Sequence, residues 1–143
     1  MMLFECTVRF NANAEDGISK KVTEVYLVDA QTFAEAETRA FQNASQLTTG
    51  SIDMLAIKRS NITVVVMQDP TGEGQKWFKA KLNYITIDEK TAKEKKQAVY
   101  YAVYASDIDN AHRFIDANLG DSVMDYEVAA INDTKIVEFV AHV

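Results

Sequence analysis

The sequence predicts an α+β fold built from two copies of a β-β-α-β(β) unit, with a mainly antiparallel sheet, two helices and pseudo-twofold symmetry. Three observations support this prediction: two series of alternating apolar and polar residues, two segments with helical apolar spacing, and the recurrence of both patterns about 74 residues later. The 143 residues, 48% hydrophobic and 25% charged, have the composition of a globular domain.

The first copy begins with two predicted strands. From Phe4 to Phe10, apolar residues alternate with polar ones, which is the period of a strand with one buried face. A polar stretch over residues 11–20 follows. Residues 22–30 are rich in β-branched side chains and predict the second strand.

A helix and two further strands complete this copy. Thr32 followed by Glu35 has the spacing of a capping box and predicts a helix from Phe33. Its apolar stripe consists of Phe33, Ala36, Ala40 and Phe41. Strands are predicted at 54–58 and 62–67, with a turn at 59–61.

The second copy repeats this order. Its predicted elements are strands 76–87 and 96–105, a helix near 107–119 that Gly120 ends, and strands 125–132 and 135–141. Ser106 or Asp107 caps the helix, and the apolar stripe is Ile108, Ala111, Ile115 and Leu119.

Residue-by-residue matches support a duplication. Residues 3–10 align with 77–84, Tyr26 with Tyr101, and Ile62 with Ile136. Residues 69–74 contain the only proline and two of the five glycines, which predicts a linker between copies 1–68 and 75–143. Because a unit of about 70 residues buries little surface alone, we expect residues 1–143 to form one domain.

Lysines are concentrated in one hairpin, although the formal charge of the chain is −6. Residues 76–96 hold seven lysines against three acidic residues. In the strand 76–87, Trp77, Lys79 and Lys81 fall on the face opposite the predicted core. Single-stranded nucleic-acid binders combine aromatic and basic side chains in this way.

Little else in the sequence indicates chemistry. Cys6 alternates with apolar neighbours and is predicted to be a buried hydrophobe, and His112 and His142 are predicted to lie on the surface. No phosphate loop, dinucleotide motif, catalytic triad or metal-ligand spacing occurs, so we expect no cofactor, no metal and no enzymatic activity. The sequence has no membrane-spanning run and no secretory signal, and we expect a cytoplasmic protein that does not bind membranes.

The pattern resembles a family of short proteins from Bacteroides-type gut bacteria, their mobile elements and phages, classed as a domain of unknown function. The resembling stretches include Phe4-Glu5-Cys6-Thr7-Val8, Trp77-Phe78-Lys79-Ala80-Lys81, Lys93-Glu94-Lys95-Lys96 and Asp125-Tyr126-Glu127. The resemblance covers nearly the whole chain. The resemblance implies no functional residues. The occurrence of the family in phages and mobile elements favours a role in DNA metabolism.

Two functional hypotheses follow. The first is a non-enzymatic protein that binds single-stranded nucleic acid. Its predicted contact residues are Trp77, Lys79, Lys81, Lys95, Lys96, Tyr100 and Tyr104. The second is a protein-interaction module or homo-oligomer that pairs exposed strand edges. A structural explanation also stands, in which Lys79 and Lys81 solvate an open sheet face and Trp77 fills a gap between the copies.

Overall fold

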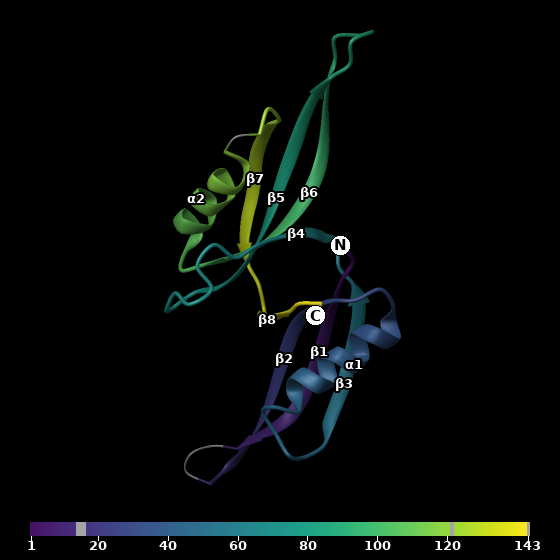
Figure 1. Ribbon diagram of the computed structural model, residues 1–143, viewed down its shortest axis with the longest axis vertical. Helices are drawn as coiled ribbons and strands as arrows, with labels where there is room; N and C mark the ends of the chain where they lie inside the picture. Colours follow the sequence, from purple (N-terminus) through teal and green to yellow (C-terminus); the bar gives the residue numbers. More distant parts are fainter. Residues whose placement is uncertain (14–16, 121, 143) are drawn as a thin grey trace. The chain divides into compact units, whose positions relative to one another are not determined.

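The computed structural model describes residues 1–13, 17–120 and 122–142. The described part of the chain contains two helices and eight strands (Figure 1). The strands form two sheets that are mixed but mostly antiparallel, so the α+β prediction is confirmed. The strands of the first half are β1 (Leu3–Asn13), β2 (Ser19–Asp29), β3 (Ile52–Arg59) and β4 (Ile62–Val66), with helix α1 (Phe33–Ala44). Those of the second half are β5 (Lys76–Ile87), β6 (Glu94–Ala105), β7 (Asp125–Asp133) and β8 (Ile136–Val140), with helix α2 (Ile108–Leu119).

The fourth strand of each half pairs in the sheet of the other half. The strand orders are β3-β1-β2-β8 in the first sheet and β4-β6-β5-β7 in the second. Three strands of each sheet come from one half and are antiparallel. The fourth is parallel to its neighbour: β8 runs beside β2, and β4 runs beside β6. The sequence predicts these fourth strands but not their exchange.

The irregularities of the two sheets occur at matching places. The ladder between β1 and β3 shifts register between Thr7 and Val8, and the ladder between β5 and β7 shifts between Lys81 and Leu82. These positions are 74 residues apart, as in the sequence alignment. The agreement supports the duplication, which stays a prediction.

The chain divides into two compact units whose boundaries differ from those of the predicted copies. The first unit contains Met1–Asn61 and Lys135–Val143, and the second contains Ile62–Thr134. The difference arises because the exchanged strands β4 and β8 belong to the unit in which they pair. That residues 1–143 form one domain stays a prediction.

Each unit has a core between its helix and one face of its sheet (Figure 1). Alanines on α1 let the helix approach the sheet closely, because they leave little side-chain volume in between. The buried residues of the first core are Phe4, Cys6, Val8, Phe10, Tyr26, Val28, Ala30, Ala36, Ala40 and Ala44. Those of the second are Val66, Phe78, Ala80, Leu82, Tyr101, Val103, Ala105, Ala111 and Ile115.

Both helices begin where the sequence predicts, but the first apolar residue of each is more than half exposed, although the ring of Phe33 contacts that of Phe4. The Oγ1 atom of Thr32 accepts a hydrogen bond from the amide of Glu35 (3.1 Å), and Oδ1 of Asp107 accepts one from the amide of Asn110 (2.8 Å). Phe33 is 55% exposed and Ile108 51% exposed, contrary to the predicted stripes. Helical side chains lean toward the N-terminus, so a first-turn side chain extends past the helix end.

We expect the second unit to fold as an isolated fragment, because residues 62–134 contain all four strands of its sheet in one continuous segment. The fragment 62–134 should unfold cooperatively in urea, as followed by circular dichroism. The fragment 75–143 lacks β4, the parallel partner of β6, and should be less stable or associate through its fourth strand. A stable monomer of 75–143 beside an unfolded 62–134 would contradict the exchange.

Candidate functional site

In each sheet, we call the face that points away from the helix of its unit the outer face. The predicted site lies on the outer face of the second sheet, opposite α2. Alternate residues of a strand share a face, and the core residues Phe78, Ala80 and Leu82 occupy the inner one. The predicted residues on the outer face are Trp77, Lys79, Lys81, Lys96, Tyr100 and Tyr104. Lys95 falls on the opposite face, so the strands bring together six of the seven.

Trp77 does not form an open platform. Its indole ring is 2% exposed and packs against Tyr104, with ring centroids 4.9 Å apart. A buried ring presents no face on which a base could stack. Strand alternation correctly places Trp77 opposite the core of its unit, but alternation does not measure accessibility.

The middle of the outer face carries two partly exposed lysines beside an aromatic ring. Lys79 Nζ lies 4.9 Å from the ring centroid of Tyr100, which is cation–π distance. Lys81 is directly opposite Tyr100 in the ladder. Among the described residues, neither lysine forms an ion pair, so both charges are available to a ligand.

Lys96 of β6 is neutralised by a carboxylate on β7, which lies on the other side of β5 in the sheet. Its Nζ lies 2.9 Å from Oε1 of Glu127 on β7, and the same oxygen accepts a 2.9 Å hydrogen bond from Nδ2 of Asn83. The hydrogen bonds from Asn83 and Lys96 lower the pKa of Glu127. The hydrogen bond to Glu127 raises the pKa of Lys96. The sequence alone does not single out Glu127 as a site residue, because its neighbours across the sheet depend on the strand register.

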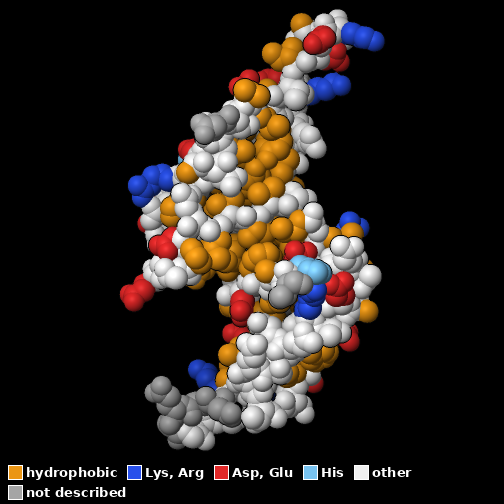
Figure 2. Space-filling view, viewed as in Figure 1, with side chains coloured by type: hydrophobic (Ala, Val, Ile, Leu, Met, Phe, Trp, Pro, Cys, Tyr) orange, Lys and Arg blue, Asp and Glu red, His pale blue; other side chains and the backbone are white. Residues whose placement is uncertain are grey.

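Lys95 also has an acidic partner, Asp88, with Nζ 3.7 Å from Oδ2. Figure 2 shows basic and acidic side chains together at the tip of the β5–β6 hairpin, in the upper part of the view. This mixture produces no strong field of one sign. Lys95 and Lys96 therefore contribute less positive charge than the sequence suggests.

Cys6 is a core residue. It is fully buried, and its Sγ lies 3.9 Å from the carbonyl oxygen of Ala36. Burial, with a smaller contribution from the charge of Glu37, raises the pKa of the Cys6 thiol to about 11. The thiolate needed for nucleophilic or metal-ligand chemistry is therefore disfavoured.

Both histidines are about half exposed, and each contacts a carboxylate. Nδ1 of His112 lies 3.0 Å from Asp116, one helical turn later, and Asp116 accepts a hydrogen bond from the hydroxyl of Tyr126. The i,i+4 spacing of His112 and Asp116 could have identified this pair in the sequence. Among the described residues, no group of three or more His, Cys, Asp and Glu could hold a metal ion.

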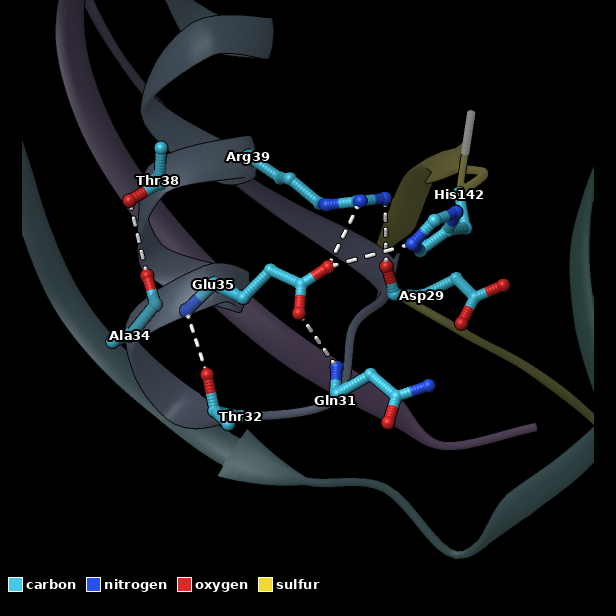
Figure 3. A network of polar contacts seen from close by, with 8 residues as sticks. All are labelled: Asp29, Gln31, Thr32, Ala34, Glu35, Thr38, Arg39 and His142. Atoms are coloured by element: carbon cyan, nitrogen blue, oxygen red, sulfur yellow. Dashed lines mark hydrogen bonds and ion pairs between the residues drawn. The ribbon is translucent and has the colours of Figure 1, made fainter.

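His142 takes part in a polar network around the first turns of α1 (Figure 3). The carboxylate of Glu35 lies 2.9 Å from Arg39 and 3.7 Å from Nε2 of His142. Arg39 also donates a hydrogen bond to the carbonyl oxygen of Asp29 (3.1 Å). These contacts connect α1 to the end of β2 and to the C-terminal segment.

We expect native Cys6 to resist thiol reagents. A thiol with a pKa of about 11 is ionised in only about one molecule in a thousand at pH 8, and this one is also buried. Ellman's reagent should react with it slowly in buffer and rapidly in guanidinium. A fast stoichiometric reaction in the folded protein would contradict the burial.

The contacts of Glu127 with Asn83 and Lys96 should make the free energy of unfolding depend on pH in the acid range. A carboxyl group whose pKa is lowered by folding contributes stability above its unfolded pKa, and loses it as pH falls through the folded value. Glu127→Gln should therefore lower the urea midpoint at pH 6 more than at pH 3. Glu89→Gln, in the exposed hairpin turn, is the control and should change neither midpoint. An equal effect of Glu127→Gln at both pH values would contradict the ion pair.

Comparison with known proteins identifies a family but no function. No curated protein and no solved structure is significantly similar to the chain. Neither described helix has the length and apolar character that crossing a bilayer requires. One family model matches residues 2–142, which is nearly the whole chain. The chain therefore belongs to the family described as a domain of unknown function, DUF4494.

Proposed function

We propose that the protein is a non-enzymatic binding protein that holds single-stranded nucleic acid on the outer face of its second sheet. The observation that carries the proposal is the arrangement of Lys79, Lys81 and Tyr100, two cations at a partly exposed aromatic ring, with Lys79 Nζ over the ring. A base could replace Lys79 on the ring while both lysines turn toward phosphates. The setting would be the cytoplasm and the DNA metabolism of phages or mobile elements, where the resembling family occurs.

Comparison of the two sheets supports this assignment. The first sheet has Glu5 and Thr7 at the positions of Lys79 and Lys81, and Val25 at that of Tyr100. Both sheets nevertheless keep the same strand order and bulge. The fold therefore does not require lysine or tyrosine at these positions, which favours a ligand as the reason for them.

The buried tryptophan and the paired lysines take supporting roles in this proposal. Trp77 packs against Tyr104 and anchors the base of the outer face, so we do not assign it a base contact. Lys96 is held by Glu127 and can contact a phosphate only in competition with that carboxylate. Lys95 lies on the inner side of the hairpin, beside Asp88.

The protein-interaction alternative receives less support from the sheet edges. Strands β4 and β8 have five residues each, and β3 and β7 carry bulges opposite their partners. Short and bulged edges are common protection against strand pairing between chains. A stable oligomer whose mass does not change with salt would favour this alternative.

The decisive variant replaces the two lysines by the residues that the first sheet carries, Lys79→Glu with Lys81→Thr. We expect the affinity for a labelled single-stranded oligonucleotide to fall at least about tenfold at low salt, because two phosphate contacts are lost. The slope of log K against log salt should also decrease by about 1.4, since each single-strand contact contributes about 0.7. Fluorescence anisotropy measures both quantities.

The control is Lys90→Glu with Lys93→Thr, which makes the same charge change in the exposed hairpin turn. It should bind almost as the unchanged protein does. The fluorescence of Trp77 is a folding probe for every variant, since the indole is buried. Unchanged affinity in the folded Lys79/Lys81 variant, or no binding by the unchanged protein at low salt, would refute the proposal.

A further inference from the structure

Each sheet carries a three-residue polar cluster on its outer face, and the two clusters occupy equivalent strand positions. The clusters are Arg9, Asp53 and Lys21 in the first sheet, and Asn83, Glu127 and Lys96 in the second. In both sheets the cluster follows the bulge directly, and the lysine is on the neighbouring strand. The two clusters therefore occupy the same place in the fold and differ only in the side chains that they contain.

The cluster of the second sheet is satisfied internally. Glu127 accepts hydrogen bonds from both Asn83 and Lys96, each at 2.9 Å. One carboxylate neutralises one ammonium group, and no charge is left over.

The cluster of the first sheet is not satisfied in this way. Arg9 Nη2 lies 3.8 Å from Asp53 Oδ2, a longer contact made by a side chain one methylene shorter than glutamate. Among the described residues, the buried Nε of Arg9 has no hydrogen-bond partner, and Lys21 forms no ion pair. The carboxylate of Asp53, whose side chain is 64% exposed, thus pairs with Arg9, while the charge of Lys21 in the same lining has no ion-pair partner among the described residues.

A cavity of about 220 Å³ opens at this cluster, lined by Arg9, Phe10, Asn11, Lys21, Ser51 and Asp53. Its volume is several times the roughly 30 Å³ that one water occupies. The lining offers a guanidinium, an ammonium, a hydroxyl and an amide, and after the carboxylate of Asp53 is subtracted from the two cations its net charge is +1. A carboxylate ligand has only two oxygens to accept hydrogen bonds from these donors. A phosphoryl group has three oxygens and up to two negative charges, and therefore matches the donors better.

We propose that this cavity is a binding site for a phosphoryl group. The planar guanidinium of Arg9 supplies paired donors that match phosphate oxygens, and Lys21 supplies a second positive charge. The hydroxyl of Ser51 donates a further hydrogen bond. Inorganic phosphate and the terminal phosphate of a nucleotide share this chemistry. The site is separate from the nucleic-acid site proposed on the second sheet, and neither depends on the other.

Titration of the full-length protein with inorganic phosphate tests the proposal, with sodium chloride at equal ionic strength as the reference. The chain has four arginines, so their side-chain Nε–Hε signals can be resolved by nuclear magnetic resonance. We expect a saturable shift of the Arg9 signal and of the Lys21 amide, with the other arginines little changed. A second titration compares a dinucleotide with and without a 5′-phosphate. A lower Kd for the phosphorylated dinucleotide than for inorganic phosphate would identify a nucleotide as the better ligand, and the reverse order would identify free phosphate.

The test variant is Arg9→Asn with Asp53→Glu, which installs the residues of the satisfied cluster and is therefore compatible with this sheet. It should weaken phosphate binding at least about tenfold, as read from the Lys21 amide. The control Arg59→Asn, on the exposed end of β3, should leave binding unchanged. The proposal is overturned if neither phosphate probe shifts Arg9 relative to chloride, if all four arginines shift alike, or if the folded variant binds as well as the unchanged protein.

Discussion

The structure depends on one requirement, which is that the buried backbone of β2 and β6 must find hydrogen-bond partners on both sides. Residues 26–28 and 101–103 are at most 2% exposed, so water cannot satisfy their amides and carbonyls. The first strand of each half pairs along one side only. The parallel strands β8 and β4 pair along the other. Each unpaired buried group would cost about 1–3 kcal/mol, so the short fourth strands matter more than their length suggests. The exchange therefore makes the sheet of each half incomplete without a strand from the other.

A second constraint, side-chain packing between each sheet and its helix, explains which residues differ between the two halves. The inner faces pack against a helix and keep similar residues, such as Phe4 and Phe78, or Tyr26 and Tyr101. The outer faces are under weaker packing constraints along most of their length. Their equivalent positions hold different chemistry, with Glu5 where the second sheet has Lys79. Charge and aromatic character thus vary on the surface where the fold tolerates variation, which is also the surface on which a ligand could select residues.

Much of the fold could be predicted from local patterns. Strand alternation from Phe4 to Phe10 and the cap at Thr32 are properties of neighbouring residues, and the predicted elements agree with the observed ones to within a few positions. The exchange of β4 and β8 could not be predicted, because a short apolar strand does not record which strand it pairs with. For the same reason the sequence located Lys96 but not Glu127, whose contact with it depends on the register of three strands. Trp77 was assigned to the correct face, but strand alternation left open whether its ring is exposed there or buried, as it is in the structure.

These contacts limit the size of the proposed nucleic-acid site. Along the hairpin, the outer face begins with the buried Trp77 and ends with the neutralised Lys96, opposite Ile85. Six strand positions separate Lys79 from Ile85, or about 20 Å at 3.4 Å per residue. Two unpaired lysines within this length can neutralise only two phosphates, whereas proteins with 6–10 phosphate contacts achieve strong binding through many released counterions. The acidic remainder of the chain opposes longer contacts. The geometry therefore favours a short strand held weakly and released readily by salt, so that Tyr100, through stacking, would supply most of the affinity that survives at moderate ionic strength.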